Sequence, residues 1–208
     1  MLFRSAVPAS FYRALRTALS ADVPAAEEAY RRTAAQMDRL GQWQHGAFVS
    51  MLGRFCLRTT QGQAGAMVDE LEPLHQIPLR TPLLAAPYAL ALTAAGRVPE
   101  ARAVVDRMPT VRRDMFWLLL TAICAMLAIA VDDTERAGSC YHELLPYAAR
   151  PAGIQTGSMT LWPTAQILGD LACYLRVDDA RAHYRHALAI AERCGVAPWR
   201  DAAMSRLQ

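Results

Sequence analysis

A run without charged side chains, residues 115–131, lies close to the centre of this chain and limits how it can fold. A helix that is apolar on every side is either buried inside a protein or embedded in a membrane. The run is near the shortest length that crosses a bilayer, and it mixes Ala, Thr and Cys with larger aliphatic residues. Because the flanking segments supply apolar faces that can cover it, we interpret the run as a buried helix and expect no membrane contact.

The flanking segments repeat one helical pattern. A small residue is followed by small or apolar residues three, four and seven positions later, which places them all on one helix face. Five copies begin at Ala26, Ala64, Ala101, Ala137 and Ala180, and their spacings are 38, 37, 36 and 43 residues. Spacings of this size are typical of repeats built from two helices. The second helix of each repeat is therefore expected to begin near the small residue.

More apolar helices are expected between these copies. They are predicted at residues 10–19, 43–58, 82–95, 115–131 and 161–175, with a closing helix at residues 198–207. Asp22, Asp133 and Asp179 lie just before predicted helix starts, where a carboxylate can cap free amides. Gly41, Gly96 and Gly195 follow predicted helix ends, where a left-handed residue is favoured.

No stretch alternates between apolar and polar residues as a strand would. We therefore predict an all-α fold in a single domain spanning residues 1–208, with about five antiparallel helix pairs and a C-terminal capping helix. The longest repeat spacing predicts one long loop, residues 148–160, which is rich in Gly, Ser and Thr. Long loops in compact domains are often functional or mobile, and both alternatives stay open.

The composition of the chain excludes several classes of function. All 22 basic residues are arginine, so phosphate-loop, Schiff-base and pyridoxal-phosphate lysines are excluded and no cofactor is expected. The net charge of +3 is too small to indicate nucleic-acid binding. The five cysteines lack a Cys-x-x-Cys spacing and are expected to be reduced core residues. Without the long apolar region of a signal peptide at the N-terminus, we expect a cytoplasmic protein.

The segment Leu168-Gly169-Asp170, followed by Ala180 and Tyr184, resembles the tetratricopeptide repeat, although it is one residue short between Gly169 and Tyr184. A wider region, residues 96–204, is similar to the helical repeats of large bacterial LuxR-type ATP-dependent regulators and multidomain nucleotide cyclases. The resemblance implies a right-handed helical array whose concave surface receives an inducer or a partner. ATP hydrolysis and DNA binding are not implied, because this chain has no Walker lysine and no expected helix-turn-helix.

The resemblance also implies candidate ligand-binding residues. In tetratricopeptide repeats the residue after Leu-Gly and the one three before Gly face the concave groove, which here are Asp170 and Gln166. The matching positions in earlier repeats are apolar, so the groove is expected to be mainly apolar. These positions are Ala86, Leu90, Ala122 and Met126. A carboxylate in such a groove could act as a general base or hold an amine, and the alternative is a partly solvated surface acid.

Further candidates come from the aromatic and basic residues. Trp162 beside the long loop, Trp117 in the central run and Tyr147 at the loop's start could stack on an aromatic or amine ligand. Arg150 in the loop could grip a phosphate or carboxylate, whereas the Arg112-Arg113 doublet is interpreted as solvated helix surface. His183 and His186 lie three residues apart without a third ligand, so we expect no metal site.

Two functions are compatible with these features. The first is a non-catalytic module with a regulatory or scaffolding role that binds a partner protein or a small effector in the groove. The second is a cofactor-free enzyme of bacterial natural-product biosynthesis, in which Asp170 would catalyse a condensation or cyclisation, for example of Pictet–Spengler type. The fold does not decide between them, and homodimerisation also stays open.

Overall fold

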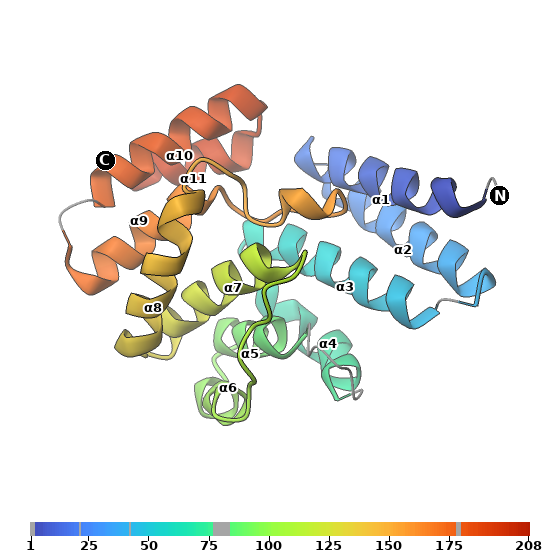
Figure 1. Ribbon diagram of the computed structural model, residues 1–208, viewed down its shortest axis with the longest axis horizontal. Helices are drawn as coiled ribbons and strands as arrows, with labels where there is room; N and C mark the ends of the chain where they lie inside the picture. The colour runs from blue at the N-terminus through green and yellow to red at the C-terminus, as the bar shows by residue number, and fades with distance from the viewer. Residues whose placement is uncertain (1–2, 21, 42, 77–83, 178–179) are drawn as a thin grey trace.

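The computed structural model describes residues 3–20, 22–41, 43–76, 84–177 and 180–208, with the side chains of residues 3–8 and 43–45 left out (Figure 1). Within these ranges the chain is all-helical, and its one β-type pairing is an isolated bridge between Pro151 and Pro163. The α-helices are α1 (Phe3–Leu19), α2 (Val23–Arg39), α3 (Trp43–Thr60), α4 (Val68–His75), α5 (Ala85–Ala94), α6 (Val98–Val105), α7 (Trp117–Ala130), α8 (Thr134–Leu144), α9 (Thr164–Leu175), α10 (Ala180–Cys194) and α11 (Ala197–Ser205). Three short 3₁₀ turns are η1 (Ala64–Met67), η2 (Leu145–Tyr147) and η3 (Ile154–Thr156). The prediction of an all-α fold is confirmed.

Most helices that are neighbours in the chain also contact each other in space (Figure 1). The pairs α1–α2, α2–α3, α5–α6, α7–α8, α9–α10 and α10–α11 are all in contact, and α7 also contacts α5 and α9. Each of the five segments predicted to be more apolar contains a helix, and so does the predicted closing segment. This order follows from the amphipathic pattern, because each helix buries its apolar face on its neighbours.

The central uncharged run forms α7 and is buried, as predicted. Eleven of its fourteen helical residues are buried, and Leu119, Ile123 and Leu127 have no exposed surface. Met115, at the start of the run, lies outside the helix and is 54% exposed. In the part of the chain that the structure describes, no helix has the length and apolarity needed to cross a membrane.

Several predicted helix ends are confirmed. The carboxylates of Asp22 and Asp133 accept hydrogen bonds from the amides of Ala25 and Arg136 at 3.1 and 3.0 Å. The glycines expected at helix ends all have a positive φ: 71° at Gly41, 78° at Gly96 and 68° at Gly195. The predicted cap Asp179 lies outside the described residues.

Two copies of the repeated pattern depart from the predicted helices. Ala64 lies in the 3₁₀ turn η1, and α4 begins four residues later at Val68. The turn passes so close to α5 that a Cβ atom on Gly65 would lie 2.9 Å from the Ala94 carbonyl carbon. Likewise α6 ends at Val105, so Met108 is not helical; the following proline disfavours helical geometry at Met108.

The long loop between α8 and α9 is packed into the molecule. Its two arms are joined by hydrogen bonds from the Ala152 amide to the Trp162 carbonyl (3.0 Å) and from the Leu161 amide to the Ala152 carbonyl (2.8 Å). Ala152, Met159 and Leu161 are fully buried. Figure 1 shows this orange segment reaching from α8 toward α1 and α3, so the loop links late and early helices.

The C-terminal helix also lies next to the first one. Trp199 of α11 is 3% exposed and packs in a small apolar cluster with Val196, against which Leu19 at the end of α1 also packs. The apolar groove positions expected from the resemblance are not an open surface, since Ala86, Leu90 and Ala122 are buried in the main core.

Candidate functional site

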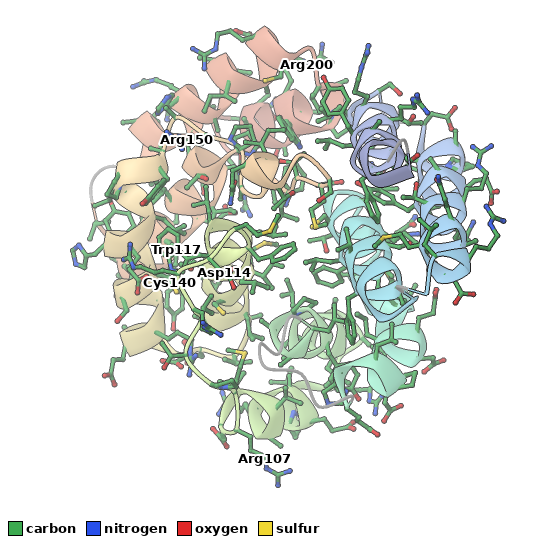
Figure 2. The ribbon with its side chains drawn as sticks, turned by 45° about the vertical axis from the view of Figure 1, so that its right-hand side comes forward. Arg107, Asp114, Trp117, Cys140, Arg150 and Arg200 are labelled. Atoms are coloured by element: carbon green, nitrogen blue, oxygen red, sulfur yellow. The ribbon has the colours of Figure 1, made fainter. Side chains whose placement is uncertain are left out.

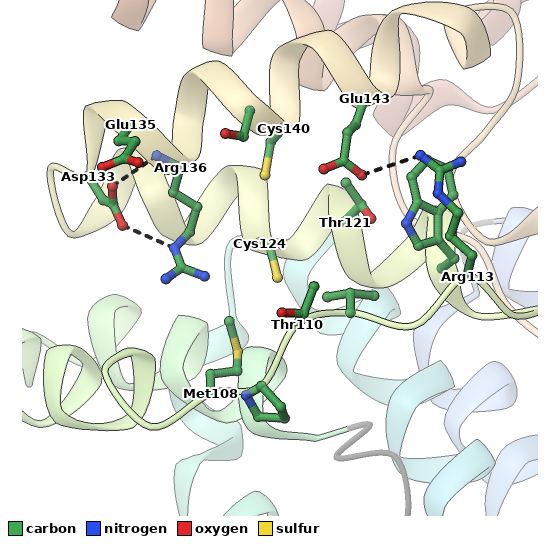
Figure 3. A pocket seen from close by; sticks show the side chains of 14 residues that line it. Met108, Thr110, Arg113, Thr121, Cys124, Asp133, Glu135, Arg136, Cys140 and Glu143 are labelled. Carbon is green, nitrogen blue, oxygen red and sulfur yellow. Dashed lines mark hydrogen bonds and ion pairs between the residues drawn. The ribbon is translucent and has the colours of Figure 1, made fainter.

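A cleft of about 690 Å³ lies between α7, α8 and the segment that joins α6 to α7 (Figure 3). We call it the α7–α8 cleft. One wall is formed by the connecting segment, and the rest by side chains from the two helices. Its lining residues are Met108, Pro109, Thr110, Val111, Arg113, Trp117, Thr121, Cys124, Asp133, Glu135, Arg136, Ser139, Cys140 and Glu143. This volume lies within the range of small-molecule sites in proteins.

The connecting segment, residues 106–116, is held mainly at its two ends. The Met108 amide donates to the Val105 carbonyl at 3.1 Å, and the Asp114 carboxylate accepts from the Phe116 amide at 2.8 Å. Between these anchors, the amides of residues 110–113 make no backbone hydrogen bond to any described residue. A stretch with few backbone hydrogen bonds opens at low free-energy cost, so this wall is the adaptable side of the cleft.

One end of the cleft combines an aromatic ring with charges of both signs. The Arg113 guanidinium carbon lies 4.5 Å from the centroid of the Trp117 ring, within the range of a cation–π contact. Arg113 Nη2 is also 3.9 Å from Glu143 Oε2. The Tyr147 ring packs edge-on against Trp117, with centroids 5.2 Å apart, and thereby supports the indole.

The opposite end is formed by the start of α8. Asp133 caps the helix, and its second carboxylate oxygen accepts a hydrogen bond from Arg136 Nε at 3.0 Å. The Arg136 amide and guanidinium together lower the pKa of Asp133. Asp133 is therefore ionised at neutral pH and already paired with Arg136, while Glu135 beside it is exposed.

The floor of the cleft carries two thiols. Cys124 and Cys140 come from α7 and α8, and Figure 3 shows both side chains between the two charged ends. Burial raises the pKa of Cys124 to about 11 and that of Cys140 to about 12. The thiolate is the reactive form of cysteine, so both side chains are poor nucleophiles near neutral pH. The cleft is thus equipped for binding by charge and stacking.

The predicted site residues fall into separate places. Trp117 lines the cleft and Tyr147 contacts it, so these two candidates are brought together. Arg150 is exposed and lies apart from Trp117 and Cys140 (Figure 2). Trp162 is half-buried and packs against apolar clusters next to the long loop.

Asp170 and Gln166 belong to a second polar cluster, on α9. The Tyr184 hydroxyl donates to Asp170 Oδ1 at 2.8 Å, and Arg206 Nη2 lies 3.3 Å from the same oxygen. Burial raises the pKa of Asp170, although Tyr184, Arg206 and Gln166 oppose that shift. Gln166 is 4% exposed, and its carbonyl oxygen has no hydrogen-bond partner among the described residues. Neither residue lines the α7–α8 cleft.

The sequence pattern does not reveal the charged members of the cleft. It predicts Arg113 as helix surface, but Arg113 lies in the connecting segment and covers Trp117. Pro109 was the signal that the helix ends before Arg113. Glu143, on the following helix, had no sequence signal of its own.

No family model, curated protein or solved structure matches this chain.

Proposed function

We propose that this protein is a non-catalytic binding module whose α7–α8 cleft receives a small effector or a short segment of a partner protein. One observation carries the proposal: the cleft has the volume of a ligand site and holds the Trp117–Arg113–Glu143 group at its aromatic end. Such a group can orient a ligand by stacking and by charge. The two thiols of the cleft, Cys124 and Cys140, stay protonated at neutral pH, which favours binding over nucleophilic catalysis.

The proposal includes a tetratricopeptide-like, right-handed arrangement of the helices. Its support is the packing of Tyr184 on Gly169, where an added Cβ atom would lie 2.4 Å from the Tyr184 ring. The family consensus places a glycine and an aromatic residue at these two positions. Arg176 adopts a left-handed conformation (φ 58°) between α9 and α10, where the family has glycine. The cytoplasmic location expected from the sequence is part of this proposal.

The rival proposal, a cofactor-free biosynthetic enzyme, rests on the raised pKa of Asp170. A raised pKa makes a carboxylate a stronger base than an ordinary one, which suits a general base. In this structure, however, Asp170 is engaged by Tyr184 and Arg206 and lies outside the cleft. The observations therefore favour the binding module.

The test is a thermal-shift screen of metabolites and short peptides against three variants. Ser139→Trp places an indole in the cleft, whereas Ala182→Trp adds the same side chain on the exposed face of α10 as a matched control. We expect a stabilising ligand to lose its effect in Ser139→Trp and to keep it in Ala182→Trp. A ligand that still stabilises Ser139→Trp, or that loses its effect only in Asp170→Asn, would contradict the proposal.

A further inference from the structure

We infer that the ligand of the α7–α8 cleft is an organic cation, an ammonium or guanidinium group, which displaces Arg113 from the face of Trp117 and pairs with Glu143. This inference rests on the proposed function of the same cleft and names its ligand chemistry. While the ligand is absent, the guanidinium group of Arg113 occupies the position of the cation over the Trp117 ring.

The Trp117 ring is a preformed surface for a cation. Trp117 is 7% exposed, and the edge-on contact with Tyr147 keeps its ring in place. Indole is the best of the aromatic side chains for cation binding, and the guanidinium carbon of Arg113 already lies 4.5 Å from the ring centroid. Arg113 itself therefore shows that a cation can occupy the face of the Trp117 ring.

Glu143 has capacity to bind a second cation. Its distance of 3.9 Å from Arg113 allows an ion pair but is too long for a hydrogen bond. Among the described residues, Arg113 is the one cation within ion-pair distance of this carboxylate. The Glu143 side chain is 43% exposed, so a ligand that enters the cleft can reach it.

Arg113 can leave at low cost. Its side chain is 69% exposed, and exposed ion pairs contribute little to stability. It is carried by the segment whose amides at residues 110–113 make no backbone hydrogen bond to the described chain. A shift of this segment would uncover Trp117 without breaking a helix.

The remaining charges of the cleft favour a cation over an anion. Three carboxylates line it, those of Asp133, Glu135 and Glu143, against the two guanidinium groups of Arg113 and Arg136. Arg136 is already engaged by Asp133 through a hydrogen bond of 3.0 Å. An anion would have to compete with that carboxylate and approach two others.

The experiment follows the indole N–H resonance of Trp117 in two-dimensional NMR, assigned with Trp117→Phe. The probes are agmatine, tetramethylammonium chloride and a blocked peptide with a central arginine, with sodium acetate and sodium phosphate as anion probes. Agmatine, which carries both an ammonium and a guanidinium group, stands for a free small-molecule cation, and the peptide stands for an arginine of a partner protein. We expect saturable shifts with cations and none with the anions.

The variants give the sharper test. Arg113→Ala removes the guanidinium group that covers Trp117, so cations should bind at least about threefold more tightly. The control is Arg112→Ala, which changes the exposed neighbouring residue and should bind cations as wild type does. Glu143→Gln should weaken cation binding about tenfold. Unchanged or weaker cation binding in Arg113→Ala would overturn the inference, and so would an anion-induced shift that this variant abolishes.

Failure of this inference and failure of the proposed function are distinguishable. If ligands from the thermal-shift screen bind the cleft but no cation shifts the Trp117 resonance, the ligand class is wrong and the binding module stands. If Ser139→Trp binds cations and screened ligands as wild type does, the cleft is not the site and both fail.

Discussion

The Tyr30 hydroxyl donates a hydrogen bond of 2.7 Å to the carbonyl oxygen of Ser158, which lies 128 residues later in the chain. Tyr30 is 1% exposed and Ser158 is 7% exposed, so the bond is shielded from water. Burial raises the pKa of Tyr30, which keeps the hydroxyl protonated as a donor. Through this bond α2 holds the long loop between α8 and α9, and thereby links early and late helices.

Replacing Tyr30 with Phe removes this donor and leaves the Ser158 carbonyl buried without it. We expect the free energy of unfolding to fall by about 1–3 kcal/mol, measured by urea denaturation. The control is Tyr12→Phe on α1, where the tyrosine is 54% exposed and the change should stay within about 0.5 kcal/mol. Equal effects of the two variants would mean that the bond does not stabilise the loop.

Gly169 of α9 allows the Tyr184 ring to approach the helix backbone. An added Cβ atom would lie 2.4 Å from the ring, so Gly169→Ala should lower stability by about 1–3 kcal/mol. Gly138 on α8 has nothing within 4 Å of its added Cβ atom, so Gly138→Ala should raise stability by about 0.5–1 kcal/mol. Melting curves of the two variants should therefore move in opposite directions, and a destabilised Gly138→Ala would contradict this.

Glu27 is a buried acid, 4% exposed, whose carboxylate accepts hydrogen bonds from Arg58 and Arg31. The hydrogen bonding with Arg58 lowers the pKa of Glu27 below its ordinary value of 4.5. The pair thus stabilises the fold above that value, and this contribution is lost as pH falls through the folded pKa. Glu27→Gln should cost about 1–3 kcal/mol at neutral pH, and the deficit should shrink in acid, as urea denaturation at several pH values can show.

Asp170 should show the opposite pH dependence. Burial raises its pKa, so its protonated form favours the folded state, and that contribution is lost as pH rises through the folded pKa. Asp170→Asn keeps an acceptor for Tyr184 without the charge, so we expect its stability relative to wild type to improve from acid to neutral pH. A relative stability that falls over the same range would mean that the Arg206 ion pair outweighs burial.

The cysteines should react at different rates with iodoacetamide. Cys173 and Cys194 are exposed, whereas Cys124 and Cys140 are buried and have raised pKa values. Mass spectrometry after brief treatment at neutral pH should therefore find alkylation at Cys173 and Cys194 first. Rapid modification of Cys124 or Cys140 would show that the cleft floor opens more readily than its burial indicates.

Much of the fold could be predicted from the sequence because its signals are local. The uncharged run of α7, the cap at Asp133 and the left-handed Gly96 each depend on residues within one or two helical turns. The same local signals identified the helices but placed the second repeat's helix too early. In that repeat Gly65 lies tightly against α5 where the sequence pattern predicts that the helix begins. This is a tertiary contact, which local signals do not report.

The sequence patterns therefore predicted the helices and the buried α7, and they suggested Trp117 and Tyr147 as candidate ligand-binding residues. The packing of the elements, in contrast, brings Arg113 over Trp117 and Glu143 beside Arg113, while Asp170 is engaged elsewhere by Tyr184. The physical reason is that helix periodicity reports which face is buried, whereas these contacts depend on how a non-helical segment and three helices lie against one another. The bond between Tyr30 and Ser158 has the same origin, since no local pattern relates residues so far apart.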